Sequence, residues 1–460
     1  MRRLFPLVFA AWLLIAPAVG QNPPPALRVS DNGRFLEDAT GKPFFWMGDT
    51  AWNLFCRLDR AEALRYLDHR SAQGFNVVQA HLLSWRPPMR NAYGEPAFRD
   101  STLRQPNEAY WQHVDFIVRE ATRRGLYLAL LPVWGATLVE PETAPFHTDT
   151  LAAHRYARFL GSRYRAFPNL IWLLGGDKRP TRHAVYDALA RGLTETYADG
   201  HPERILLTFH PPGGTHRPPA TSSGEFYHDR PWLDLNLIQS GHARENRSYE
   251  RIAEDYRRTP PKPTLDSEPC YEQHPVKHDY RNGAFSAWDA RRRGYWSVLA
   301  GACGYTYGGN GVWQMDKPGQ VLKTSHFKDY WDMALDYEGA RQMTHLRRFF
   351  EKMEFARLVP DSTLLASPPG SVDDRVQVAR DEAGRWVLAY LTSGGPVAFD
   401  ARRMPARPVA VAWFNPRIGV LGAFKPVASR GELRLNAPES GSGNDWIAVV
   451  KTKGTPISGK

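Results

Sequence analysis

Two short runs in this sequence each place a carboxylate at the end of an apolar stretch. The first is Asn169-Leu-Ile-Trp-Leu-Leu-Gly-Gly-Asp177, and the second is Pro263-Thr-Leu-Asp-Ser-Glu-Pro269. Each reads as a buried strand that breaks directly after its acidic residue. Two carboxyl groups are the minimum for hydrolysing a glycosidic bond, because one protonates the leaving oxygen and the other faces the anomeric carbon. We assign Asp177 as general acid/base and Glu268 as nucleophile.

The sequence leaves alternatives to both assignments. Asp177 could instead cap a following helix, a frequent role of aspartate. Asp266 and Glu272 lie close to Glu268 and could take its role, and strand alternation directs Asp266 to the same side as Glu268. When two carboxyl groups share a cleft, the ionised one raises the pKa of its neighbour. The neighbour then stays protonated near neutral pH and can act as the general acid.

The elements that would position this pair alternate between apolar runs and helix-like segments from about residue 28 to about residue 353. Eight strands with helices between them favour a closed (β/α)8 TIM barrel, in which catalytic side chains stand at the strand C-termini. An open nucleotide-binding sheet would need a glycine-rich turn after its first strand, and Gly48-Asp-Thr does not provide one. The expected strands are 44–47, 75–81, 126–134, 170–174, 205–209, 233–238, 263–268 and 304–307. The expected helices are 60–73, 151–164, 183–197, 249–257 and 284–300.

Aromatic and polar residues follow the other strand ends. Apolar sugar faces stack on aromatic rings, and sugar hydroxyls need paired donors and acceptors, so such a ring of side chains suits carbohydrate binding. The three histidines among them show neither a helical i, i+4 pair nor a His-x-His, so we expect no metal and no cofactor. The expected substrate-binding residues are Asp49, Trp52, His81, Trp85, Trp134, His210, Gln239, His242, Tyr307, Asn310 and Trp313.

Both ends of the chain differ from this central part. Arg2 and Arg3 precede an apolar run from 4 to 16, and a cleavage site is expected before Gln21. This pattern predicts a signal peptide, and a periplasmic or secreted protein without a membrane segment after cleavage.

A short hairpin is expected over 28–42, followed by the barrel. Beyond about residue 359, short strands at 376–379, 385–390, 409–413 and 446–450 predict a small antiparallel β-sandwich. The expected division is 1–20, 21–358 and 359–460, with 360–370 as linker.

Composition narrows the range of partners. The formal net charge of +11 over 460 residues would suit an anionic partner such as an acidic polysaccharide, although a generally basic, soluble surface explains the charge more simply. No nucleic-acid-binding motif is present, and neither are the GxSxG, HExxH, P-loop or EF-hand patterns. The three cysteines, Cys56, Cys270 and Cys303, form no CxxC pair, so we expect them to be buried thiols.

The sequence resembles a known family at several of these positions. The run from Phe35 to Trp52, Gly74-Phe-Asn-Val-Val-Gln79, Trp172-Leu-Leu-Gly-Gly-Asp177 and Asp266-Ser-Glu-Pro269 resemble the apiosidase-like barrels of glycoside hydrolase family 140. The tail is similar to a collagen-binding type of domain that often follows these barrels. The resemblance implies a retaining hydrolase with Asp177 as acid/base and Glu268 as nucleophile. It further implies a pectic substrate of the rhamnogalacturonan II type, in which apiose is linked to galacturonic acid.

Two other functions stay open on the sequence. The barrel could be a non-catalytic carbohydrate- or matrix-binding scaffold, although acidic residues at two strand ends argue against this. A collagen-directed hydrolase is indicated only by the similarity of the tail, and no protease motif supports it.

Overall fold

The computed structural model describes residues 23–83, 89–100, 104–135, 149–197, 205–213, 221–321, 326–428 and 431–452. The predicted signal peptide therefore lies outside the described residues. Within the described ranges, no helix combines the length and the apolar character needed to cross a membrane.

A small antiparallel sheet precedes the barrel, and its first two strands form the predicted hairpin. The sheet contains β1 (Leu27–Val29), β2 (Leu36–Asp38) and β3 (Pro43–Phe44), paired in that order. Gly33 makes the first turn possible with a φ of 70°. At the second turn the Asp38 carboxylate accepts hydrogen bonds from the backbone N–H groups of Thr40 and Lys42.

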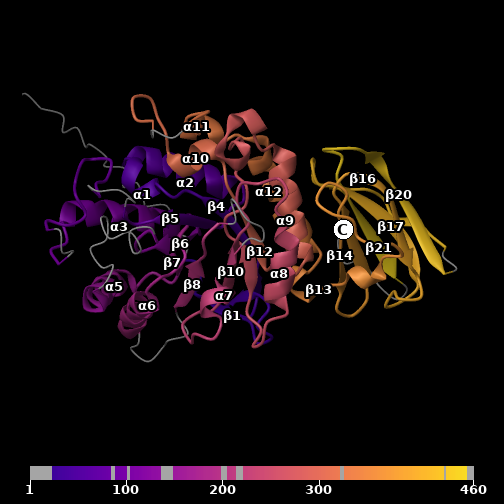
Figure 1. The fold of residues 1–460 in the computed structure, drawn as a ribbon, viewed down its shortest axis with the longest axis horizontal. Coiled ribbons are helices and arrows are strands. Elements are labelled where there is room, and N and C mark those ends of the chain that lie inside the picture. Colours follow the sequence, from indigo (N-terminus) through magenta and orange to yellow (C-terminus); the bar gives the residue numbers. More distant parts are fainter. Residues whose placement is uncertain are drawn as a thin grey trace, which may run out of the picture.

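Eight parallel strands form the barrel that the sequence predicts (Figure 1). The sheet runs β8-β7-β6-β5-β4-β12-β11-β10, with the short antiparallel β9 (Thr221–Ser222) beyond β10. A parallel bridge between Thr208 and Leu235 closes the gap between the two edges. The strands are β4 (Trp46–Thr50), β5 (Val77–His81), β6 (Tyr127–Leu131), β7 (Leu170–Gly175), β8 (Leu206–His210), β10 (Asn236–Gln239), β11 (Thr264–Asp266) and β12 (Gly304–Tyr307).

Helices surround the sheet, and all five predicted helices are present within a few residues of their expected ends. Capping explains two sharp starts: Asp59 with Glu62 begins α2, and Ser286 with Asp289 begins α9. The amphipathic helices α3 and α12 were not predicted. The helices are α1 (Leu54–Arg57), α2 (Arg60–Ala72), α3 (Glu108–Arg123), α5 (Thr150–Tyr164), α6 (His183–Tyr197), α7 (Gly224–Tyr227), α8 (Ser248–Tyr256), α9 (Ala287–Leu299), α10 (Asn310–Gln314), α11 (Trp331–Ala334) and α12 (Glu338–Lys352).

The barrel interior is filled by side chains rather than open. Among them, a buried polar chain crosses the barrel, with Trp46 Nε1 donating to Thr306 Oγ1 at 3.0 Å and Gln79 Nε2 donating to the Ser267 carbonyl at 2.9 Å. All three cysteines are buried free thiols, as expected. The layer of paired polar groups fixes the relative positions of β4, β5, β11 and β12 below their C-terminal ends.

The C-terminal part is an antiparallel β-sandwich, as predicted. A seven-stranded sheet contains β13, β14, β15, β21, β17, β18 and β19, and β16 pairs with β20 in a second sheet. The expected linker is partly wrong, because β13 already pairs with β14 and the side chains of Leu364 and Leu365 belong to the sandwich core. The strands are β13 (Leu358–Pro360), β14 (Val376–Asp381), β15 (Trp386–Leu391), β16 (Gly394–Asp400), β17 (Pro408–Asn415), β18 (Val420–Leu421), β19 (Lys425–Pro426), β20 (Glu432–Ser440) and β21 (Trp446–Thr452).

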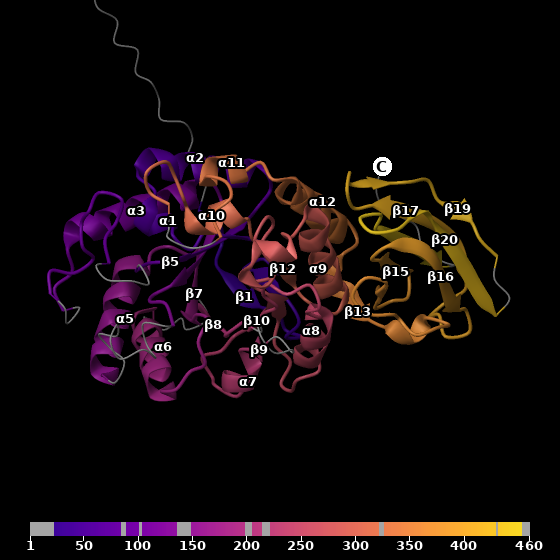
Figure 2. The same ribbon diagram turned by 45° about the horizontal axis from the view of Figure 1, so that its top comes forward.

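The sandwich lies against α9 and α12 of the barrel (Figures 1 and 2). At the centre of this contact, Arg291 on α9 pairs with Asp445, with Nη2 2.5 Å and Nε 2.9 Å from the carboxylate oxygens. The Arg291 side chain is 3% exposed and that of Asp445 is 0% exposed. Tyr390 donates a further hydrogen bond to Asp445, and Trp296 donates one to Thr392. This contact contains a buried ion pair, which holds the sandwich against α9.

We expect Asp445→Asn to destabilise the protein by about 3 kcal/mol or more, because it leaves the buried Arg291 guanidinium without its counter-charge. Urea unfolding followed by fluorescence measures the change. Glu432→Gln is the matched control, since Glu432 pairs with an Arg434 side chain that is 80% exposed, and its loss should stay below about 1 kcal/mol. Equal losses in the two variants would contradict a structural role for the interface pair.

Candidate active site

A cavity of about 360 Å³ opens at the C-terminal ends of the barrel strands. This is the face where TIM barrels carry their active sites, and the volume is that of a small-molecule site. The cavity brings together eight of the residues that the sequence predicted: Trp52, His81, Trp134, Asp177, Gln239, His242, Glu268 and Trp313.

Asp177 enters the cavity from an unusual backbone turn at the end of β7. Gly175 and Gly176 have φ values of 87° and 121°, and Asp177 itself has a φ of 50°. A side chain at Gly175 would overlap the His210 carbonyl oxygen, and one at Gly176 would press on the Trp134 ring. The two glycines are therefore needed for the close approach of β7 to β8. The left-handed conformation of Asp177 costs of order 1 kcal/mol or more. Such strained conformations are found mainly where they position a functional group.

Burial raises the pKa of Asp177 to about 6, and the nearby negative charge of Glu268 adds to the rise. The positive charge of His210 and a hydrogen bond from Gln239 act in the opposite direction. In that bond, Gln239 Nε2 donates to Asp177 Oδ1 at 2.9 Å. Asp177 therefore keeps its proton up to about pH 6, as a general acid near neutrality must.

Glu268 lies just beyond the end of β11, and both of its carboxylate oxygens lie against donors. Tyr271 donates its hydroxyl hydrogen to Oε1, and the same hydroxyl accepts from Trp52 Nε1 at 2.9 Å. His210 Nε2 lies 2.9 Å from Oε2, close enough for an ion pair, although the angle does not satisfy a hydrogen bond. These contacts fix the carboxylate in place.

His210 supports Glu268 from behind the cavity wall rather than from within it, because it is fully buried at the end of β8. Burial lowers the pKa of His210, but its contact with Glu268 and the charges of Glu268 and Asp177 outweigh this, so the pKa lies above its ordinary value. The ring can therefore carry a positive charge beside two carboxyl groups.

The cavity wall is largely aromatic. Trp52 and Trp134 meet edge to face with centroids 5.1 Å apart, and Tyr271 lies 6.1 Å from Trp313. Such rings offer flat apolar faces to sugar C–H groups, while Gln239 and Asn53 supply polar atoms at the edge. The wall thus has the mixed character that carbohydrate binding requires.

The structure corrects four predicted substrate contacts, His210 and the three that follow, none of which lines the cavity, and leaves one outside its described residues. Asp49 is fully buried inside the barrel wall, 2.8 Å from Arg70 Nε, and accepts a hydrogen bond from Tyr66. Tyr307 is also buried and donates to Glu272. Asn310 does not line the cavity, because its side-chain amide bonds to the backbone carbonyl of the neighbouring His326. The remaining residue, Trp85, lies outside the described residues.

The two competitors for the role of Glu268 are also placed elsewhere. Asp266 accepts hydrogen bonds from the Ser240 hydroxyl and backbone N–H, and burial raises its pKa to about 6. Glu272 accepts from Tyr307 and from the Gly339 backbone. Neither carboxyl group lines the cavity, so Asp177 and Glu268 are the carboxyl pair of the described cavity lining.

Sequence reasoning missed part of the cavity lining. Tyr271 and three histidines, His274, His278 and His326, reach the cavity from loops beyond β11 and α10. Burial and neighbouring imidazoles lower the pKa of His242 and His274, and burial lowers that of His326, so these rings are uncharged at neutral pH. The spacing His274-x-x-x-His278 was the one sequence signal that could have pointed to them.

Comparisons with known proteins agree with this architecture. A family model described as "Apiosidase-like, catalytic domain" matches residues 30–357. A second, described as "Putative collagen-binding domain of a collagenase", matches residues 359–451. A comparison with curated proteins finds no match.

Several solved structures are similar to this chain. A protein described as a glycoside hydrolase is 31% identical with a TM-score of 0.85, and the match covers 94% of this chain and 98% of that one. A glycoside hydrolase family 5 protein from Bacteroides vulgatus ATCC 8482 is also 31% identical, with a TM-score of 0.85 and coverage of 95% and 94%. The endo-1,4-beta-mannanase from Rhizomucor miehei is 13% identical with a TM-score of 0.50 over 71% of this chain and 99% of that one, which shows a shared fold alone.

We expect Gly175→Ala to destabilise the protein by more than about 2 kcal/mol, because a left-handed φ costs about 1–2 kcal/mol and the new methyl group would also overlap the His210 carbonyl. Gly94→Ala is the matched control, since Gly94 has a φ of 80° with no atom within 4 Å of an added Cβ. Differential scanning calorimetry compares the two. If both variants lose the same stability, the close approach of β7 to β8 does not require the glycine.

Proposed function

The chain belongs to the apiosidase-like glycoside hydrolases, and we propose that it cleaves the bond between apiose and galacturonic acid in pectic side chains by a retaining mechanism. One observation carries the catalytic part of this proposal. Asp177, with a pKa of about 6, shares a single cavity with a Glu268 carboxylate that is surrounded by donors. The family and the basic charge of the chain support the choice of substrate.

In the first step, Glu268 attacks the anomeric carbon while the bond from that carbon to the leaving oxygen breaks. Asp177 gives its proton to the leaving oxygen, and a covalent sugar–Glu268 ester forms. The raised pKa of Asp177 makes the proton available, and its neighbour's charge is one cause of that rise. As Glu268 becomes a neutral ester, this cause disappears and the pKa of Asp177 falls, so Asp177 remains ionised after giving up its proton.

In the second step, Asp177 acts as a base and removes a proton from water. The water oxygen attacks the anomeric carbon, the ester bond breaks, and Glu268 returns as a carboxylate. Tyr271 and His210 are positioning residues here, because each lies against one oxygen of the Glu268 carboxylate. Two inversions at one carbon give net retention.

The surroundings of the carboxyl pair support an acidic substrate. Lys178 lines the cavity next to Asp177, and the chain carries a net charge of +11. A uronic acid carboxylate would be attracted to this environment. The aromatic wall formed by Trp52, Trp134 and Trp313 would receive the sugar faces. Arg2 and Arg3, followed by the apolar run from 4 to 16, support export of the protein. An exported enzyme could reach polymeric plant substrates outside the cytoplasm.

We expect Asp177→Ala and Glu268→Ala each to lower the rate of sugar release from pectic polysaccharide roughly a hundredfold or more. The measurement is product release from a panel of plant polysaccharides, with apiose identified chromatographically and its anomeric configuration followed by NMR. Asp266→Asn is the matched control, because Asp266 is a buried carboxyl at the end of β11, two residues before Glu268, whose pKa is also about 6 but which does not line the cavity.

Near wild-type rates in the control, together with an initial product of unchanged anomeric configuration, support the proposal. Wild-type protein that binds a glycan without releasing sugar would contradict the enzymatic roles and favour the binding scaffold. An inverted product would contradict the role of Glu268 as nucleophile.

A further inference from the structure

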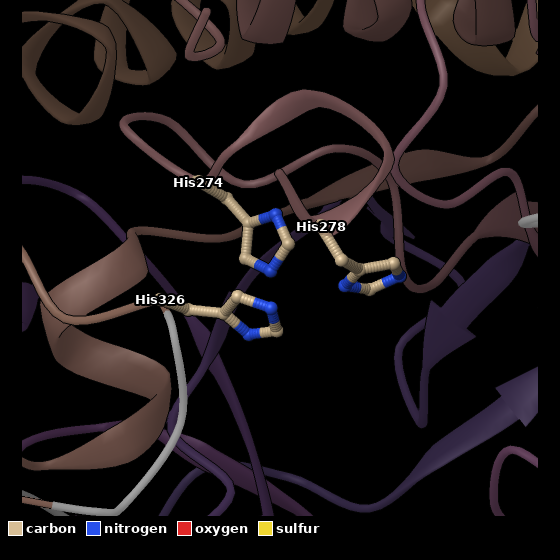
Figure 3. Close-up of side chains that lie close together, drawn as sticks. All are labelled: His274, His278 and His326. Atoms are coloured by element: carbon tan, nitrogen blue, oxygen red, sulfur yellow. The ribbon is translucent and has the colours of Figure 1, made fainter. Parts of the chain in front are cut away.

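Three histidine rings that line the cavity converge on one another (Figure 3). His274 and His278 come from the loop after β11, and His326 comes from the segment after α10. One ring nitrogen of each lies within 4.8 Å of those of the other two. The catalytic steps described above use none of these side chains.

The loop that carries His274 and His278 adopts a costly backbone conformation to present them. Gln273, Lys277 and His278 have φ values of 65°, 53° and 62°, in the region that non-glycine residues rarely occupy. Backbone hydrogen bonds hold the loop, from Lys277 N–H to the His242 carbonyl at 2.7 Å and from Gln273 N–H to the Phe285 carbonyl at 2.8 Å. Such conformations persist where the surrounding structure fixes them, often at ligand sites.

The ring of His274 is oriented for coordination. Its Nδ1 lies 2.9 Å from the Pro275 carbonyl oxygen, so Nδ1 carries the hydrogen and Nε2 keeps a free lone pair. A histidine that binds a metal usually donates its second nitrogen to a carbonyl or carboxylate in this way. His326 is anchored by its backbone carbonyl, which accepts from the Asn310 side chain and from the Tyr280 hydroxyl.

A fourth imidazole completes the surroundings of the three. His242 stacks on His274 with centroids 4.0 Å apart and an interplanar angle of 20°. It is 5% exposed, and its Nδ1 has no hydrogen-bond partner among the described residues. A buried polar atom without a partner is rare in a folded protein and calls for an explanation, such as an ion or water at that place.

We propose that His274, His278 and His326 bind one divalent transition-metal cation of the Zn²⁺ class at the rim of the cavity. Imidazole nitrogens suit Zn²⁺, Ni²⁺ or Cu²⁺, whereas Mg²⁺ and Ca²⁺ prefer oxygen ligands. Three protein ligands leave at least one coordination position open. Since all three rings line the cavity, this position faces the cavity, where an oxygen atom of water or of a bound sugar would complete the coordination.

Isothermal titration of the metal-stripped, full-length protein with ZnCl₂ tests this proposal without any substrate, so it stands or falls independently of the proposed hydrolysis. We expect one Zn²⁺ per chain, an increase of the melting temperature on binding, and no comparable binding of Mg²⁺. His278→Ala and His326→Ala should each weaken Zn²⁺ binding at least tenfold, because each removes one of three ligands. Two variants on separate loops keep the test informative if one of them fails to fold.

His154→Ala is the matched control, since His154 lies on α5 and pairs with Glu195 on α6. It should bind Zn²⁺ as the wild type does. With Co²⁺ in place of Zn²⁺, the wild type should show the visible absorption bands of Co²⁺ coordinated by nitrogen. These bands should be lost in His278→Ala. Absence of stoichiometric binding, or equal binding by wild type and both cavity variants, would overturn the proposal.

Discussion

The main constraint on this structure is electrostatic, because two carboxyl groups, Asp177 and Glu268, line the same cavity. Two adjacent negative charges with little access to water are strongly unfavourable. Here the two groups differ in their surroundings: Asp177 retains its proton up to about pH 6, while Glu268 accepts a hydrogen bond from Tyr271 and lies 2.9 Å from His210 Nε2. In the mechanism that we propose, the same difference supplies an acid and a nucleophile, so the arrangement that makes burial tolerable would also make hydrolysis possible.

The scaffold serves this division through backbone geometry and through packing. Gly175 and Gly176 let β7 pass close to β8, which places Asp177 opposite the end of β11. On the other side, α9 connects the strand ends to the C-terminal sandwich. Arg293 on α9 donates to Ser240, which in turn bonds to Asp266, while Arg291 two residues earlier pairs with Asp445 of the sandwich. The sandwich therefore supports the end of β11, which Glu268 follows.

Much of this could be predicted because the signals are local. Two apolar runs that each end in an acidic residue, Asp177 after two glycines and Glu268 before a proline, predicted two strands and the two carboxyl groups that line the cavity. The position of Asp49 at a strand end could not reveal that its carboxylate turns into the barrel wall, because its partner Arg70 lies on the following helix. The histidine cluster was missed because three left-handed residues shape its loop and His326 comes from a distant segment. The direction of a side chain, and the meeting of residues far apart in the sequence, are decided by tertiary packing. The spacing of residues along the sequence does not predict either.

The coupling between the two carboxyl groups is the central claim, and the pKa of Asp177 measures it directly. Carbon-13 NMR of the aspartate carboxyl groups, with Asp177→Asn to assign the signal, gives this pKa in wild type and in Glu268→Gln. We predict a value of about 6 in the wild type, against an ordinary 3.8. The value should fall in Glu268→Gln, because a neutral neighbour no longer opposes ionisation while burial remains. A wild-type pKa near 4, or one that does not move in Glu268→Gln, would contradict this account.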